Sequence, residues 1–226
     1  MLPEAHVGMV DEVFKSSSAI LNTFLKIMNE RTYNGVRCPL LMLMGASNEY
    51  PNNDNGGKEL HALFDRFLFR KQIKPITARN GRAELLRRAV EMNSCTPTFL
   101  NTIDPVSIRK ANGESLALPW SNDAKKALWE VMQQLDKEGV FPGDRRLFKA
   151  VNAARAYAYL KGGKDVQPEH LEILAHVLWD DPQEQPKVVA KVIAKVCNPV
   201  GMKLNDLRDV GAGSRVHVGA AALATG

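Results

Sequence analysis

Two short, mostly apolar segments separated by a helical pattern constrain the fold of this chain most strongly. The first covers residues 6–10 and ends in Asp11 and Glu12, and the second covers residues 40–45 and also ends in polar residues. Short apolar runs without a polar face are typical of strands buried in a parallel sheet. Between them, residues 16–30 carry apolar side chains at spacings of three and four, which predicts a helix. This order predicts an α/β fold.

Residues 58–92 continue the alternation of helical and strand patterns. Helical periodicity is present over residues 58–66 and 82–92, and residues 67–73 form a third candidate strand. In parallel α/β sheets, ligands bind outside the carboxyl ends of the strands. The polar residues that follow the first two strands are therefore candidates for a binding site.

The chain changes character beyond Pro97. Four helices are predicted there with no strand pattern between them, over residues 122–137, 145–160, 168–178 and 186–196. We therefore predict a parallel-sheet domain over residues 1–96 and a separate all-helical domain over residues 97–200. Residues 201–226 end in a run rich in Gly and Ala, and we expect this tail to be disordered.

The composition argues against several other classes of protein. A chain of 226 residues with 45% hydrophobic content can form a packed core. Its apolar runs are too short to span a bilayer, and residues 1–12 have no signal-peptide pattern, so we expect no membrane association. Three widely spaced cysteines fit neither a disulfide framework nor a zinc site, which favours a reducing cytoplasm.

Asp11, Glu12 and Asn48 are the strongest candidates for catalysis. In nucleotide hydrolysis, one of two adjacent carboxylates at a strand end holds Mg²⁺ and the next polarises the attacking water. Asn48 follows the neighbouring strand, where its amide is suited to orient that water or to contact the γ-phosphate. Each residue also has a plain structural interpretation, because acids favour helix starts and Asn favours turns.

Four motifs occur in an order that a known family shares. Four segments together are similar to a Walker B region: LPEAH at residues 2–6, VDEVFK at 10–15, SAILN at 18–22 and NER at 29–31. Residues 46–49, ASNE, are similar to sensor 1. Residues 62–67, ALFDRF, are similar to a segment that bears an arginine finger, and residues 144–146, DRR, to sensor 2. Over roughly residues 2–181 the chain thus resembles the MoxR family of AAA+ ATPases, its RavA-like branch most closely.

The resemblance implies a role for each matching residue around ATP and Mg²⁺. Asp11 would coordinate Mg²⁺, Glu12 would act as the base or water-orienting group, and Asn48 would sense the γ-phosphate. The resemblance also implies the fold: a partial AAA+ core, from the Walker B strand onward, followed by an all-helical lid domain.

Two arginines complete the implied site. Arg66 would be the finger that reaches the nucleotide of a neighbouring subunit, and Arg70 is the reserve candidate. Arg145 would contact the bound nucleotide from the lid, and Arg146 is the alternative if the register differs by one residue. Without the resemblance, Arg66 would be interpreted as a partner in a surface salt bridge, and Arg145 as part of a basic helix start.

A phosphate-binding P-loop of the form Gly-x-x-x-x-Gly-Lys-Ser/Thr does not occur in the sequence. The Gly-Gly-Lys triplets at residues 56–58 and 162–164 lack the leading glycine and the following Ser or Thr, so we predict loops there. The family places its P-loop upstream of Walker B, so the resemblance implies a C-terminal part of such an ATPase. Without the P-loop strand we expect a gap or an abnormal pairing in the sheet, and marginal stability.

Three functions follow from these patterns. The first is an ATPase in a ring, expected to be hexameric, that drives chaperone-like remodelling or metal-cofactor insertion in an unidentified client protein. The second is a non-catalytic interaction subunit that donates Arg66 to an intact neighbour in a mixed ring. The third, nucleic-acid binding, is not favoured, because the net charge is only +5 and no aromatic residues interleave with the basic ones, Arg79, Arg82, Arg87, Arg88, Arg109 and Lys110.

Overall fold

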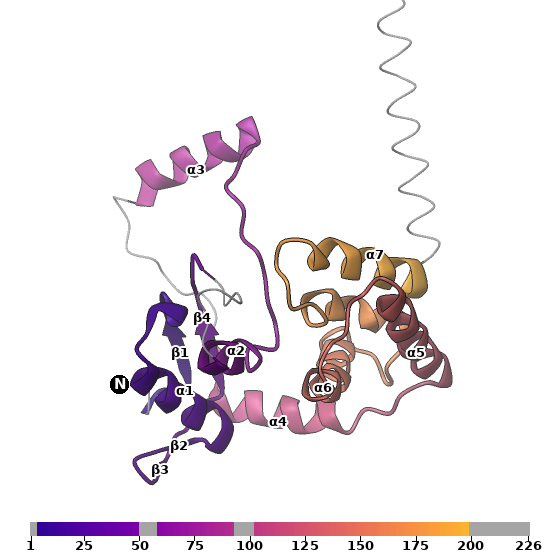
Figure 1. Ribbon diagram of the computed structural model, residues 1–226, viewed down its shortest axis with the longest axis horizontal. Coiled ribbons are helices and arrows are strands. Elements are labelled where there is room, and N and C mark those ends of the chain that lie inside the picture. Colours follow the sequence, from indigo (N-terminus) through magenta and orange to yellow (C-terminus); the bar gives the residue numbers. More distant parts are fainter. Residues whose placement is uncertain (1–3, 50–57, 93–101, 199–226) are drawn as a thin grey trace, which may run out of the picture. The chain divides into compact units, whose positions relative to one another are not determined.

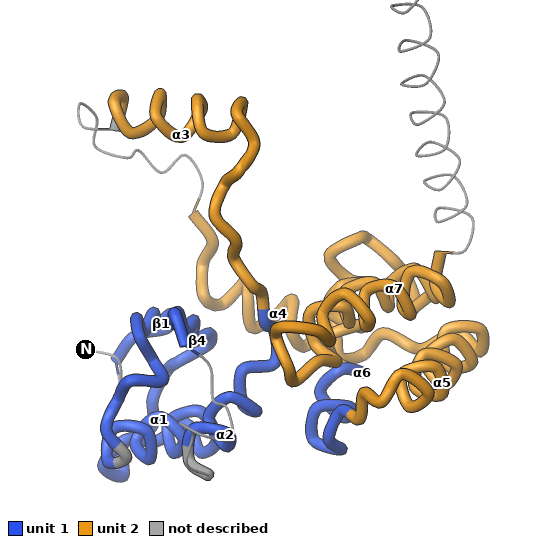
Figure 2. The backbone as a smooth tube through the Cα atoms, turned by 45° about the horizontal axis from the view of Figure 1, so that its top comes forward, with its two compact units in different colours: residues 1–70, 142–151 blue, residues 71–141, 152–226 orange. Residues whose placement is uncertain are grey.

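The computed structural model describes residues 4–49, 58–92 and 102–198 (Figure 1). The chain divides into two compact units (Figure 2). Unit 1 comprises residues 1–70 with 142–151, and unit 2 comprises residues 71–141 with 152–226. The predicted tail at residues 201–226 lies outside the described residues, and the boundary between residues 96 and 97 stays a prediction.

Unit 1 is built around a small parallel sheet. Strand β1 (Val7–Val10) pairs with strand β4 (Met42–Gly45), so that Val7 lies opposite Met42 and Val10 opposite Gly45. Because the strands are parallel, their carboxyl ends share one edge of the sheet. The α/β fold class, the first two strands and their parallel pairing are thereby confirmed.

The third strand predicted over residues 67–73 is wrong. These residues form no strand, and the parallel sheet of the described chain has two strands, β1 and β4. Phe67 packs against the core of Val13, Leu21 and Leu63, but Phe69 is 53% exposed and Ile73 is 82% exposed, so the run is not buried along its length. A strand needs a neighbour to bond its backbone N–H and C=O groups, and the described part of the sheet offers none to this segment. The missing neighbour agrees with the expected gap in the sheet.

One face of the β1–β4 sheet carries exposed apolar side chains. Val7 and Met9 of β1 and their partners Met42 and Met44 of β4 are between 41% and 70% exposed. In a parallel sheet both faces are normally covered. This exposure supports the prediction of marginal stability.

The other elements of unit 1 pack into two small cores. Helix α1 (Ser18–Glu30) and helix α2 (Lys58–Phe64) lie against each other and against the short 3-10 helix η2 (Val13–Lys15). The first core is formed by Val13, Leu21 and Leu63, and the second by Ile27, Cys38 and Leu40. Burial of these side chains fixes the turn after β1 and the end of α2, which both carry candidate site residues.

A tight hairpin follows α1. Strands β2 (Thr32–Tyr33) and β3 (Val36–Arg37) are antiparallel and are joined by Asn34 and Gly35, whose φ angles are 48° and 79°. Positive φ at both central residues defines the turn type that Asn-Gly favours. Asn34 and Gly35 therefore fix the turn of this hairpin.

Unit 2 is helical. An all-helical domain was predicted for residues 97–200, whereas unit 2 also includes residues 71–92, which the sequence assigned to the parallel-sheet domain. Its core contains fully buried aliphatic side chains, among them Leu135, Leu171 and Val189. The helices lie close to their predicted positions, although one of them is a 3-10 helix: α3 (Arg79–Met92), α5 (Asn122–Lys137), α6 (Asp144–Leu160), η3 (Pro168–His176) and α7 (Gln185–Cys197). The first residues of α6 belong to unit 1. In the described part of the chain, no helix has the length and apolarity needed to cross a membrane.

Helix α4 (Pro105–Leu116) was not predicted. Asp104 caps its start by accepting a hydrogen bond from the Val106 N–H, and Pro105 occupies its first turn. The Asp-Pro pair is a recognised helix-start signal. Val106 and Leu116 are 64% and 43% exposed, so the helix buries only a weak apolar stripe. Because that stripe is weak, apolar periodicity did not predict the helix.

Candidate functional site

The segments that follow β1 and β4 are hydrogen-bonded to each other. The Ala46 N–H donates to the Val10 carbonyl at 2.9 Å, and the Val13 N–H donates to the Ala46 carbonyl at 3.1 Å. Asp11 and Glu12 lie between Val10 and Val13, the two residues that these hydrogen bonds anchor to Ala46. Asn48 comes two residues after Ala46. The fold therefore brings the candidate acids and the candidate sensor 1 residue to the same edge of the sheet.

Glu12 has a strained backbone. Its φ and ψ are 48° and 41°, in the left-handed region, and its N–H donates to Asp11 Oδ1 at 2.9 Å. For a residue other than glycine this conformation costs about 1–2 kcal/mol. Such strain persists only where the surroundings enforce it, and it is concentrated at functional sites. The anchors on either side, at Val10 and Val13, enforce it here.

Lys15 links the two segments, a contact that sequence analysis missed. Its Nζ lies 3.1 Å from Glu12 Oε1 and 3.9 Å from Glu49 Oε1. The hydrogen bond to Glu12 is the main cause that raises the pKa of Lys15. The spacing of three residues between Glu12 and Lys15 in the VDEVFK motif was the available signal.

A second group of candidates converges on Asn29, near the end of α1. Arg66 Nε donates to Asn29 Oδ1 at 3.0 Å, and Arg145 Nη2 donates to the same oxygen at 2.8 Å. Arg66 also donates to the Ala62 carbonyl at 2.5 Å. Burial, followed by the charge of Arg145, lowers the pKa of Arg66. The candidate finger and the candidate sensor 2 residue are thus neighbours within unit 1.

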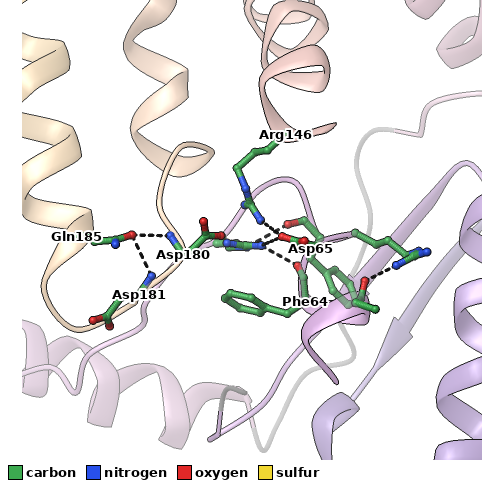
Figure 3. Close-up of polar contacts among 10 residues, drawn as sticks. Phe64, Asp65, Arg146, Asp180, Asp181 and Gln185 are labelled. Carbon is green, nitrogen blue, oxygen red and sulfur yellow. Dashed lines mark hydrogen bonds and ion pairs between the residues drawn. The ribbon is translucent and has the colours of Figure 1, made fainter. Parts of the chain in front are cut away.

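The alternative candidates, Arg70 and Arg146, are buried and bound to Asp65. Arg146 Nη2 lies 2.5 Å from Asp65 Oδ1, beside Phe64 (Figure 3), and Arg70 Nη2 lies 3.6 Å from the same oxygen. Arg70 also stacks on the Phe64 ring at 3.7 Å and donates to the Phe64 carbonyl at 2.8 Å. Their exposed fractions are only 6% and 4%. Arg66 is half-buried and Arg145 is exposed, so these two are better placed to meet a ligand.

Asp11 stays the candidate ligand for a Mg²⁺ ion bound together with a nucleotide. Among the described residues, no group of three or more His, Cys, Asp or Glu side chains is placed to hold a metal ion by itself. Mg²⁺ is usually held by one or two carboxylates, with phosphate oxygens and water completing its octahedron. Asp11 is exposed and carboxyl-bearing, and satisfies that requirement.

Some of the remaining basic residues have structural partners. On α3, Arg87 pairs with Glu84 at 2.8 Å and with Glu91 at 2.5 Å, and Arg88 pairs with Glu84 at 2.7 Å. The arginines Arg87 and Arg88 lower the pKa of Glu84 to about 2. Residues 162–164 form the predicted loop after α6, whereas most of the triplet at 56–58 lies outside the described residues.

Comparisons with known proteins identify the family and the fold of this chain. Residues 1–112 match the family model of the MoxR domain in the MoxR-vWA-beta-propeller ternary systems, and residues 123–193 match an AAA lid domain. A crystal structure of a candidate ATPase from Cytophaga hutchinsonii ATCC 33406 has a similar fold. It has a TM-score of 0.60 and 16% identity, and the similarity covers 85% of this chain and 66% of that one. Fold and matched models together define an AAA+ protein.

Two relatives of Methanocaldococcus jannaschii extend the comparison. The uncharacterised protein MJ0812 is 38% identical over 201 residues, which are 87% of this chain and 51% of the relative. The uncharacterised protein MJ0079 is 35% identical over 213 residues, which are 92% of this chain and 53% of the relative. This chain spans about half the length of these curated relatives. It belongs to the MoxR family of AAA+ ATPases, whose members in general bind ATP with Mg²⁺ and assemble into rings.

Proposed function

We propose that this chain contributes to an ATP-hydrolysing site in a ring of AAA+ subunits. The observation that carries the proposal is the parallel pairing of β1 with β4, which ends at Val10 opposite Gly45. This pairing puts Asp11, Glu12 and Asn48 at the carboxyl edge of the sheet, where nucleotides bind in α/β folds.

Each residue at this edge has a distinct chemical task in the proposal. Mg²⁺, when bound with ATP, neutralises phosphate charge. Asp11 holds the ion with the oxygen that does not accept the Glu12 N–H. Glu12 orients the attacking water and removes its proton, and Lys15 fixes the direction of the Glu12 carboxylate. Asn48 donates its amide N–H to the γ-phosphate or to the water.

We propose that Arg66 and Arg145 bind phosphate groups, Arg66 as the finger that reaches the nucleotide of a neighbouring subunit. Among the described residues, no hydrogen bond or ion pair joins Arg66 or Arg145 to Asp11, Glu12 or Asn48, which favours a site shared between subunits. Arg70 and Arg146 are engaged by Asp65, which supports the choice of the other two arginines. A ring of subunits, which we take to be a hexamer, supplies such neighbours.

The cellular task stays at the level of a proposal. The matched family model describes ternary systems of a MoxR, a vWA and a beta-propeller protein, so we propose vWA and beta-propeller proteins as partners. ATP hydrolysis would drive chaperone-like remodelling or metal-cofactor insertion in a client of that system. The buried, free thiol of Cys38 supports the expected reducing cytoplasm. Membership of the RavA-like branch stays a prediction, as do a core over residues 1–96 and a lid over 97–200.

Glu12→Gln tests the proposal, in a chain extended by the P-loop segment of a MoxR relative joined ahead of Met1. Loss of the general base lowers kcat by about 100-fold or more, because general-base catalysis contributes 10²–10⁴-fold. Affinity for ATP is retained, since glutamine has the same shape. Glu91→Gln, which changes an exposed carboxylate on α3, leaves turnover unchanged. Normal turnover in Glu12→Gln would remove the proposal.

The second candidate function is a non-catalytic subunit that lends Arg66 to an intact neighbour. The observation in its favour is that Arg66 is already oriented by Asn29 and Ala62 without a nucleotide. In a mixed ring with a P-loop-bearing MoxR protein, Arg66→Ala then lowers the partner's ATPase activity by about 10³-fold. Arg88→Ala, on the exposed surface of α3, serves as the control. An unchanged partner activity in Arg66→Ala would exclude this role.

A further inference from the structure

Unit 1 holds two pairs of arginines by two different kinds of acceptor. Arg70 and Arg146 share the carboxylate of Asp65, whereas Arg66 and Arg145 share the amide oxygen of Asn29. The acceptors differ in charge although the geometry is similar, because each pair places two guanidinium groups around one side-chain oxygen. The difference in charge decides what else each pair can bind.

The carboxylate of Asp65 compensates the charge beside it, while the amide of Asn29 does not. A carboxylate close to two guanidinium groups leaves them a net charge of about one, whereas an amide by itself offsets none of their charge. The charge of Asp65 also acts on Arg66, so the pair on Asn29 is compensated only in part and from outside its shared acceptor. The pair on Asp65 is also buried, at 6% and 4% exposure, which suits a structural role. Arg145 is exposed and Asn29 is exposed, so the pair on Asn29 can meet a dissolved anion.

Lys149 adds to the positive charge around this second pair. It is half-buried on α6, one helical turn after Arg145. Burial is the main cause that lowers the pKa of Lys149, followed by the charges of Arg145, Arg66, Arg146 and Arg31. Several cations held this closely repel one another, and an anion that binds among them relieves the repulsion.

We propose that Asn29 is a positioning residue that holds Arg66 and Arg145 as one cationic pair for the phosphate groups of a nucleoside triphosphate, and that its neutrality is essential. The proposal rests on the nucleotide roles proposed above for the two arginines. Asn29 itself touches no phosphate; it fixes the guanidinium groups before the anion arrives, so that binding does not have to order them.

Asn29→Asp separates this role from a purely structural one. The substitution keeps the size and the accepting oxygen, and it strengthens both hydrogen bonds because the acceptor becomes charged. A structural role therefore predicts an unchanged or improved protein in every respect. The positioning role predicts that the melting temperature is maintained or raised while anion binding is lost.

The experiment measures binding of inorganic triphosphate to the full chain by isothermal titration calorimetry. We expect the unsubstituted chain to bind and Asn29→Asp to bind at least about ten-fold more weakly, because the added charge repels the anion. Asn29→Ala, which keeps the positive charge but frees the arginines, binds about three-fold more weakly. Asn22→Asp, an equal change two turns earlier on an exposed position of α1, binds as the unsubstituted chain does.

Two results would overturn the inference. The first is unweakened binding of triphosphate by Asn29→Asp, and the second is no binding by the unsubstituted chain. Thermal melting by circular dichroism accompanies each titration, and if Asn29→Asp does not fold, the roughly three-fold loss in Asn29→Ala decides instead. The proposed ATPase function is tested separately. If the variants bind triphosphate with the expected relative affinities but the chain extended by a P-loop hydrolyses no ATP, the inference about Asn29 holds and the ATPase function is excluded.

Discussion

Replacing Asp65 with alanine should destabilise unit 1 by about 2 kcal/mol. Asp65 Oδ1 lies 2.5 Å from Arg146 Nη2 and 3.6 Å from Arg70 Nη2, and the side chains of these arginines are 3% and 4% exposed. A hydrogen bond with a charged partner contributes about 1.5–3 kcal/mol, and breaking a fully buried pair costs about 3–5 kcal/mol. Because the side chain of Asp65 is 63% exposed, solvent screening places the cost in the lower range.

The assay exploits the distribution of tryptophan. All three tryptophans, Trp120, Trp129 and Trp179, belong to unit 2, so their fluorescence reports that unit, while far-ultraviolet circular dichroism reports both. In urea unfolding of Asp65→Ala we expect an earlier transition by circular dichroism and an unchanged transition by fluorescence.

A double-mutant cycle isolates the contact with Arg146. Arg146→Met removes the buried charge but retains much of the apolar volume, and the coupling energy with Asp65→Ala should be about 1–2 kcal/mol. A coupling energy below about 0.5 kcal/mol, or an unmoved circular dichroism transition in Asp65→Ala, would refute the reasoning.

Three further outcomes follow from packing and burial. Gly45→Ala should lower the free energy of unfolding by about 1–3 kcal/mol, because the added Cβ would lie 2.9 Å from Phe67 Cζ. Gly113→Ala, with open space at its Cβ, should raise the free energy of unfolding by up to about 1 kcal/mol. Urea unfolding measures both changes. Leu63→Ala, at a fully buried position, should cost about 2–5 kcal/mol by the same method. Burial raises the pKa of the Cys197 thiol from 9.0 to about 11. Alkylation of Cys197 at pH 8 should therefore be slow in the folded chain and fast in urea. The stability that the neutral thiol contributes should be lost as pH rises from about 9 to about 11. Equal alkylation rates in both states would contradict this burial.

The spacing of apolar residues correctly predicted the helices and strands whose apolar side chains pack into a core. Residues 7–10 and 42–45 form strands, and residues 122–137 form a helix with the predicted bounds, because their apolar spacing matches the periodicity of each structure. The apolar run at 67–73 misled the same reasoning, since a strand also needs a partner and apolarity does not supply one. Helix α4 escaped it because its cap, rather than an apolar stripe, marks its start.

The candidate site was partly accessible from sequence. Asp11, Glu12 and Asn48 could be placed at one edge because parallel strands end together, which is a rule of topology. Asn29 could not be found this way, since it meets Arg145 across 116 residues of sequence. The preference for Arg145 over Arg146 stays a proposal that draws on the structure, because neighbouring residues on a helix point in different directions and, of these two, Arg146 is the one that meets Asp65.

The central claim is that one ATPase site takes Glu12 from one subunit and Arg66 from its neighbour. The direct measurement mixes Glu12→Gln subunits with Arg66→Ala subunits, both extended by the P-loop segment of a MoxR relative, and follows ATP turnover. Each variant alone should be inactive. Random mixing in equal amounts should restore about a quarter of the unsubstituted activity, because about a quarter of head-to-tail interfaces then combine an intact Glu12 with an intact Arg66. No recovery at any mixing ratio would contradict the account, because it would place both residues in the site of a single subunit.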